Sequence, residues 1–167
     1  VQGLGNVILN AGRAHSKGLE FALGYRPVKG LNLNLDYGYT HARYLKYVKS
    51  EKENYSHKYL PMVPNHTLAL TGSYTVMPMG WLDRLVFSAG MTGVGRIYWT
   101  DNNAVSQNFY ATLNAKVSMS KGIFTWEVWG KNLTATDYVA YGFVTGKDYY
   151  GQKGKPLTFG TSLEINL

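Results

Sequence analysis

Apolar and polar residues alternate along much of this chain, and the closing segment shows the alternation most clearly. In residues 156–167 the odd positions carry Leu157, Phe159, Leu163, Ile165 and Leu167, with Thr161 as the one polar residue among them. The even positions carry Thr158, Gly160, Ser162, Glu164 and Asn166. Because a β-strand turns successive side chains to opposite faces, this pattern predicts a strand with one apolar and one polar face.

The same period of two recurs in six earlier segments, so the sequence predicts about seven strands. The other six are residues 18–25, 31–39, 66–76, 84–95, 109–119 and 123–133. The clean alternation from Leu31 to Tyr39 is close to the roughly 9–11 residues that a tilted strand needs to cross a bilayer. Strands of this length suit a membrane barrel as well as a soluble sheet.

The predicted connections alternate between short and long. The short ones, residues 26–30, 77–83 and 120–122, contain the Gly and Pro residues typical of turns. The long ones, residues 40–60, 96–108 and 134–155, are polar and rich in tyrosine, and we expect them to be loops. Outer-membrane barrels have short periplasmic turns and long extracellular loops. The alternation therefore favours an all-β, antiparallel, up-and-down transmembrane barrel segment.

The two faces distinguish a barrel from a soluble sandwich, which would bury the apolar rows. Charged residues interrupt the polar faces at mid-strand, and both a wet lumen and bulk water would tolerate them. Aromatic residues lie near the predicted strand ends, as the interfacial girdles of membrane barrels require. These are Tyr25, Tyr37, Tyr39, Trp81, Trp99 and Trp126. They favour the barrel, with aromatics packed in a sandwich core as the alternative.

Composition excludes several classes of protein. The 167 residues contain no cysteine, so there is no disulfide framework and no thiolate metal site. The net charge of +7 comes from basic residues that form no basic helix, so nucleic-acid binding is not expected. No apolar run approaches the ~20 residues of a membrane helix, so a bilayer protein with this sequence would be a barrel.

The sequence contains no grouping of residues that points to catalysis. His15, His41, His57 and His66 have no metal-ligand spacing, and no Ser/His/Asp combination is evident. Asp101-Asn102-Asn103 lacks the remaining ligands of a calcium loop. We therefore expect neither an enzyme nor a cofactor or metal site.

Several segments, taken in order, resemble the C-terminal part of the β-barrel of TonB-dependent outer-membrane receptors. The most specific are Asn10-Ala11-Gly12 followed by Lys17-Gly18-Leu19-Glu20, and Lys131-Asn132-Leu133-Thr134 with Tyr138. The resemblance covers nearly the whole chain. It implies that residues 1–167 are about seven strands of a 22-stranded barrel, with the plug domain and the upstream strands absent from this stretch.

The last strand resembles the C-terminal signal that the barrel assembly machinery reads. In that signal a polar residue is followed two positions later by Gly and then by alternate hydrophobic residues. The matching residues are Thr158, Gly160, Leu163, Ile165 and Leu167, with Leu167 in place of the Phe that ends many such proteins. The resemblance thus implies two further partners, this machinery and outer-membrane lipid.

The function implied by the resemblance is active transport across the outer membrane of a Gram-negative cell. Such receptors bind and import scarce ligands such as ferric siderophores or cobalamin, with energy from TonB that is delivered through the absent N-terminal region. The alternative is a cell-surface structural or adhesive β-barrel domain that binds a macromolecule. Nothing in the residues identifies the ligand.

Candidate ligand-binding residues lie in the long connections. Aromatic side chains bury area with few rotatable bonds, and a cation attracts an anionic chelate. The candidates are Tyr59, Arg96, Tyr98, Trp99, Tyr141 and Tyr149. The competing interpretation is that these aromatics cap the barrel rim or cover the loop stems.

Overall fold

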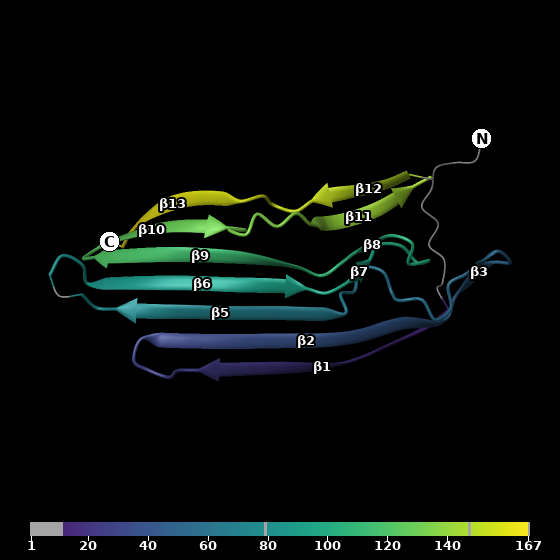
Figure 1. Ribbon diagram of the computed structural model, residues 1–167, viewed down its shortest axis with the longest axis horizontal. Coiled ribbons are helices and arrows are strands. Elements are labelled where there is room, and N and C mark those ends of the chain that lie inside the picture. Colours follow the sequence, from purple (N-terminus) through teal and green to yellow (C-terminus); the bar gives the residue numbers. More distant parts are fainter. Residues whose placement is uncertain (1–11, 79, 147, 167) are drawn as a thin grey trace.

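Seven long strands form one antiparallel sheet, which we describe from a computed structural model of residues 12–78, 80–146 and 148–166 (Figure 1). The strands are β1 Arg13–Tyr25, β2 Leu31–Lys46, β5 His66–Val76, β6 Arg84–Val94, β9 Tyr110–Lys121, β10 Phe124–Lys131 and β13 Thr158–Ile165. Their order in the sheet follows the chain, from β1 at one edge to β13 at the other. In the described ranges we find no helix with the length and hydropathy needed to cross a membrane.

Three small hairpins occupy the long connections. They pair β3 Val48–Ser50 with β4 Glu53–Asn54, β7 Ile97–Tyr98 with β8 Ser106–Gln107, and β11 Val139–Thr145 with β12 Asp148–Lys153. The hairpins lie at the right of Figure 1, which we call the loop end, and the short turns lie at the left, which we call the turn end. The up-and-down topology predicted from the sequence is therefore confirmed.

All seven predicted strands are present, and β5 has the predicted bounds. The prediction of loop for residues 40–60 was wrong at its beginning, because β2 continues to Lys46 and stays paired with β1, as in the pair Ser16–Ala42. The backbone hydrogen bonds between two strands do not require an apolar face. The alternation of apolar and polar residues therefore ends near Tyr39, while the pairing of β2 with β1 continues. Residues 96–108 and 134–155 likewise contain hairpins that the sequence pattern did not reveal.

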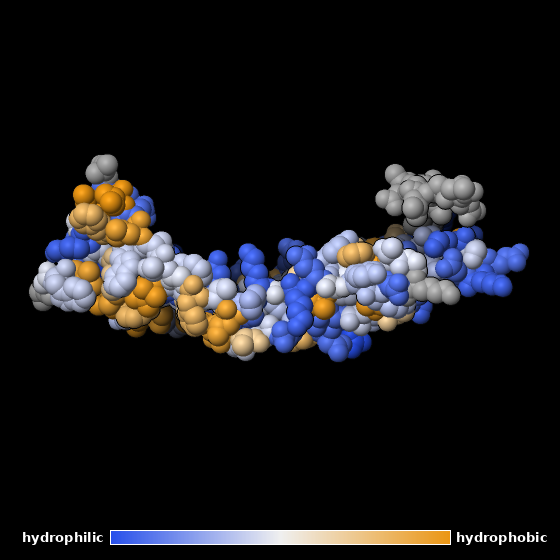
Figure 2. Space-filling view, turned by 90° about the horizontal axis from the view of Figure 1, so that it is seen from above, coloured by the Kyte–Doolittle hydropathy of each residue, from blue (hydrophilic) through white to orange (hydrophobic). Residues whose placement is uncertain are grey.

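The register aligns the apolar rows of neighbouring strands on one face, which we call the outer face. One row runs across five strands through Leu23, Leu35, Leu70, Met91 and Leu113. The adjacent row on the opposite, inner face runs through Gly24, Asn34, Thr71, Gly90 and Asn114. Figure 2 shows hydrophilic residues in the hollow of the sheet and apolar residues gathered on the convex side towards the turn end.

No second layer of the described chain covers the outer face. Leu23 is 52% exposed and Leu163 is 62% exposed. The buried apolar residues of the described ranges are Ala42, Tyr44, Leu82, Ile97 and Trp99, and none belongs to the apolar rows of the sheet. A sandwich would have buried those rows between two sheets. The structure is therefore a barrel segment, left open with β1 and β13 as its edges.

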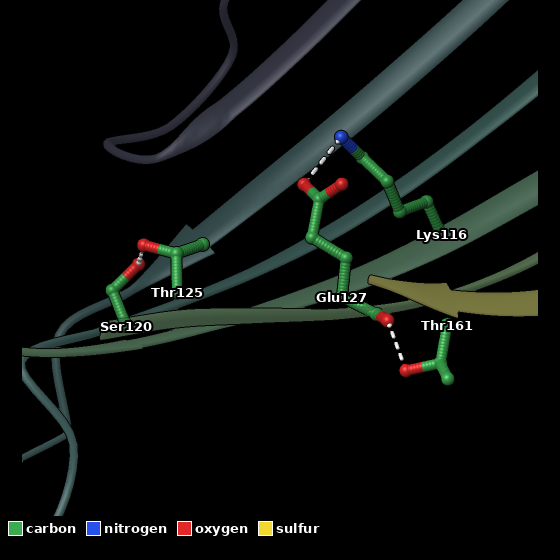
Figure 3. Close-up of polar contacts among 5 residues, drawn as sticks. All are labelled: Lys116, Ser120, Thr125, Glu127 and Thr161. Carbon is green, nitrogen blue, oxygen red and sulfur yellow. Dashed lines mark hydrogen bonds and ion pairs between the residues drawn. The ribbon is translucent and has the colours of Figure 1, made fainter. Parts of the chain in front are cut away.

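Thr161, the one polar residue of the apolar row in β13, satisfies its hydroxyl group within the sheet. The hydroxyl donates to the carbonyl oxygen of Glu127 at 2.8 Å, as Figure 3 shows, and accepts a hydrogen bond from Nε1 of Trp126. An unpaired hydroxyl in an apolar environment is costly, whereas a hydrogen-bonded one is tolerated. A threonine on the outer face is thus compatible with contact with lipid.

Candidate functional site

The inner face carries the polar chemistry expected of a barrel lumen. Nζ of Lys116 lies 2.7 Å from Oε1 of Glu127, and the hydroxyl of Thr125 donates to that of Ser120 at 3.1 Å (Figure 3). These residues come from the neighbouring strands β9 and β10. Their charges and hydroxyl groups are paired across the strands, so the inner face is suited to a hydrated interior.

Trp99 is the centre of the packing at the loop end. It is 9% exposed, and its backbone N–H donates to the carbonyl oxygen of Val105 at 2.9 Å. The indole ring lies against Gly142 of β11 so closely that a Cβ there would be 2.8 Å from Cγ of Trp99. Tyr141 meets the same ring edge-on, with 6.3 Å between the ring centroids. This packing fastens the β7–β8 hairpin to the β11–β12 hairpin.

A second set of contacts joins the β7–β8 loop to the end of β2 and to the segment that follows it. The hydroxyl of Tyr44 donates to Oδ1 of Asp101 at 2.7 Å, and burial together with this hydrogen bond raises the pKa of Tyr44. The side-chain amide of Asn103 pairs with the backbone of Tyr59 in both directions, at 2.7 and 2.9 Å. The φ angle of Asn103 is 58°, a left-handed conformation that asparagine tolerates better than most residues. The three long connections therefore form one assembly.

A cleft of about 460 Å³ opens between the three connections. Its lining includes Glu53, Tyr55, Met62, Trp99, Asp101, Phe143 and Tyr149. The hydroxyl of Tyr55 donates to Oε1 of Glu53 at 2.7 Å, which lowers the pKa of Glu53 and raises the pKa of Tyr55 to about 12. At neutral pH the cleft therefore combines aromatic surface with carboxylates and hydroxyl groups, a combination suited to a bulky polar ligand.

The six candidate ligand residues fall into two groups in the structure. Trp99 and Tyr149 line the cleft, and Tyr141 lies beside Trp99. The other three are placed elsewhere: Tyr59 and Tyr98 stack on each other with centroids 5.3 Å apart, and Arg96 donates to Oδ1 of Asn108.

Sequence reasoning missed Phe143, Met62 and Asp101 as lining residues of the cleft. Phe143 was detectable in principle, because it continues the aromatic pattern of residues 141–150. For Asp101, nothing in the sequence indicates that it meets Tyr44, which is 57 positions away in the chain.

The residues of the candidate assembly signal lie along β13, where they pair with β10. Gly160 is opposite Trp129, and a Cβ on this glycine would collide with the indole ring. Leu163 pairs with Trp126 and Ile165 with Phe124, while Leu167 lies outside the described residues. Gly160 thus has a packing role in the folded sheet, whatever its role in recognition.

The fold brings some histidines closer together than their spacing in the sequence indicates. The rings of His15 and His41 lie 6.0 Å apart, and His66 contacts Tyr39. In the described part of the chain, no three His, Asp or Glu residues are grouped as metal ligands would be.

A comparison with protein families gives a match to the family described as "TonB dependent receptor-like, beta-barrel" over residues 1–153. The chain belongs to this family. Its members are receptors of the Gram-negative outer membrane and not enzymes.

Solved structures with the same fold include three iron-uptake receptors. The ferric yersiniabactin uptake receptor FyuA from Yersinia pestis matches 93% of this chain, with a TM-score of 0.82 and 21% identity. The ferric preacinetobactin receptor BauA from Acinetobacter baumannii matches 90% of this chain, with a TM-score of 0.73 and 18% identity. The ferric-catecholate import receptor Fiu from Escherichia coli K12 matches 93% of this chain, with a TM-score of 0.66 and 18% identity.

This chain spans only 24%, 22% and 21% of those three chains, respectively. At such identities the likeness shows the fold, which is that of one segment of a larger barrel. The fold class predicted from the sequence is therefore confirmed.

Proposed function

We propose that residues 1–167 form the C-terminal part of the barrel of a receptor that imports a ferric siderophore, with energy delivered through TonB. Membership of the receptor family and the iron chelates named for the similar structures support this proposal. The polar inner face and the apolar outer face supply the wet lumen and the lipid contact that such a receptor needs.

The observation that carries the proposal is the cleft between the three long connections. It lies at the loop end, which is the extracellular end of a barrel of this type. Trp99 packs closely against Gly142, and Tyr149, which also lines the cleft, is exposed. Rigid and exposed aromatics at such a rim can capture a bulky chelate at low entropic cost.

The test uses the full-length receptor in an iron-limited strain that lacks its own copy. Uptake of radiolabelled iron is measured with a panel of ferric siderophores, in the presence and absence of TonB. We expect one chelate to support TonB-dependent uptake, and Tyr149→Ala to weaken its binding by about tenfold.

Tyr25→Ala is the matched control for Tyr149→Ala. Tyr25 is 59% exposed and Tyr149 is 58% exposed, but Tyr25 lies at the turn end. Uptake that does not depend on TonB, or no uptake of any chelate by the wild-type receptor, would contradict the proposal. An equal loss of binding in both variants would contradict the assignment of the cleft.

We further propose that Thr158, Gly160, Leu163, Ile165 and Leu167 act as the signal for the barrel assembly machinery. The support is that Thr158, Gly160, Leu163 and Ile165 lie in an edge strand of this segment, where the pairing groups of the backbone are available.

A further inference from the structure

A band of basic side chains lies on the outer face at the loop end, and the ligand site leaves it without a role. We call it the outer basic band and define it by Lys17, His41, Arg43, His66 and Arg96. Lys17 pairs with His41 two positions beyond the apolar pair Leu19–Tyr39, so it continues the outer row. His66 pairs with Tyr39 and precedes Leu68 by two positions on the same face.

Among the residues that the structure describes, no carboxylate forms an ion pair with the band. The acidic residues of β1 and β2, Glu20 and Asp36, alternate onto the inner face. The ion pairs of the described residues are Lys49–Glu53, Lys116–Glu127 and Lys121–Asp83. Within the described ranges, Lys17, Arg43 and Arg96 therefore have no carboxylate at ion-pair distance, and the positive charge of the band is uncompensated.

Tyrosine rings hold the band together at the height of the aromatic girdle. The hydroxyl of Tyr37 lies 2.8 Å from Nδ1 of His66, and the ring of Tyr39 lies 5.1 Å from the ring of His66. The guanidinium of Arg43 lies over Tyr59, with 4.1 Å from Cζ to the ring centroid. Tyrosines in such girdles sit at the level of lipid headgroups.

An apolar groove of about 510 Å³ leads from Arg96 down the outer face. Tyr37, Leu68, Gly93 and Phe109 line it. Gly93 makes room for the ring of Phe109, because a Cβ at residue 93 would lie 3.1 Å from that ring. Nε and Nη2 of Arg96 both donate to Oδ1 of Asn108, which fixes the guanidinium at the mouth of the groove.

We propose that the outer basic band binds the phosphate groups of a phosphorylated glycolipid of the outer leaflet, with one acyl chain in the groove below Arg96. Lys17 and His41 lie two residues beyond the pair Leu19–Tyr39, a rise of about 7 Å that corresponds to the depth of headgroup phosphates, and His66 lies in the same row as Tyr39. A chelate in the loop cleft would not occupy this groove, because the cleft and the groove share no lining residue. The positive charge of the band, its level in the membrane and the adjoining apolar groove together fit a phosphate group carried by a lipid better than a soluble anion.

The test measures binding of bis-phosphorylated lipid A to the delipidated full-length receptor by native mass spectrometry, beside the dephosphorylated form. We expect the wild-type receptor to prefer the phosphorylated form. Each basic side chain near a membrane surface contributes about fivefold in affinity, so Lys17→Gln or Arg96→Gln should each weaken binding by about that factor. The triple variant with Arg43→Gln should weaken it by about a hundredfold.

Lys131→Gln is the control, because it removes the same charge from the inner face, where Lys131 lies over Trp129. We expect it to bind lipid A as the wild type does. If loss of the Arg43 stacking prevents folding of the triple variant, Lys17→Gln still tests the proposal, because Lys17 is exposed on the surface of β1.

Three results would overturn the proposal: equal binding of the dephosphorylated lipid, equal loss in Lys131→Gln, or displacement of lipid A by millimolar inorganic phosphate. Iron uptake by Lys17→Gln should remain at the wild-type level. Failure of the lipid site is thus distinguishable from failure of the transport proposal.

Discussion

The sheet and the loop end of this molecule differ in whether the chain itself buries their apolar side chains. In the sheet, rows such as Leu23–Leu35–Leu70 lie on the outer face, where no other part of the described chain covers them. At the loop end, Tyr44 and Trp99 are buried by other parts of the same chain. The sheet thus depends on its solvent for apolar contacts, whereas the loop end builds a small core of its own in water.

The two regions also differ in the kind of hydrogen bond that holds them together. The sheet is joined by regular backbone ladders, whereas side chains tie the loop end together, as between Asn103 and Tyr59. Asn132 lies between the two regions and is buried. Its side-chain nitrogen donates to the carbonyl oxygens of Thr136 and Lys155, and its side-chain oxygen accepts a hydrogen bond from the N–H of Thr136. A local change should therefore affect one region without the other.

The largest effect is expected for Trp99→Ala. Removing a buried tryptophan costs about 3–5 kcal/mol, and here the cost should fall on the local stability of the loop end. Amide hydrogen exchange should accelerate at Trp99 and along β11, with no change in the sheet. Trp81→Ala is the control, since Trp81 is 74% exposed at the turn end. Equal acceleration in the sheet would show that the two regions unfold together.

Leu70→Arg should destabilise the sheet itself. Leu70 lies at mid-strand on the outer face, where an arginine costs about 2–4 kcal/mol at the bilayer midplane. Thr71→Arg places the same residue on the inner face, where water can solvate it, and should cost much less. The free energy of unfolding of the full-length receptor in vesicles measures both. Equal costs would mean that the two faces have been assigned incorrectly.

Gly160→Ala should have an intermediate effect, because its methyl group would collide with Trp129. Overpacking of this kind costs about 1–3 kcal/mol. Gly90→Ala is the control, since its Cβ would lie 3.5 Å from Cγ2 of Thr71, an ordinary contact. The folded fraction is read from heat-modifiable mobility. If Trp129→Leu restores folding of Gly160→Ala, the glycine is needed for packing; if it does not, its role lies in assembly.

The smallest effect is a pH dependence of the β3–β4 hairpin. The hydrogen bond from Tyr55 lowers the pKa of Glu53 below its usual 4.5, so this stabilisation is present above that pH and is lost as the pH falls through the lowered pKa. The pKa of Tyr55 is raised from 10.0 to about 12, so stability is also lost as the pH rises between these values. The NMR chemical shifts of Glu53 and Tyr55, measured as a function of pH, should show titration of Glu53 below pH 4.5 and of Tyr55 near pH 12.

Tyr55→Phe is the control for this pH dependence. Without the hydroxyl group, the low-pH transition should move back towards the usual pKa of a glutamate. An unchanged transition would show that the hydrogen bond to Glu53 does not form in solution.

The position and length of the strands could largely be predicted, and the candidate site only in part. A half-solvated strand repeats every two residues, so β5 was found at its full extent. Hairpins outside the apolar layer carry no such period, and β11 and β12 were therefore missed. Tyr98 and Trp99 are adjacent in the sequence, yet one stacks on the outer side with Tyr59 and the other lines the cleft.

The sequence by itself determined which side chains share a face, because alternation along a strand is a local property of the backbone. The tertiary structure decided which loop residues meet, because contacts such as Tyr44–Asp101 and Trp99–Gly142 join segments far apart in the chain. It also decided that Arg96 stands above an apolar groove on the outer face and not in the cleft. Such placements depend on the register of neighbouring strands, and no local pattern of residues encodes that register for a loop.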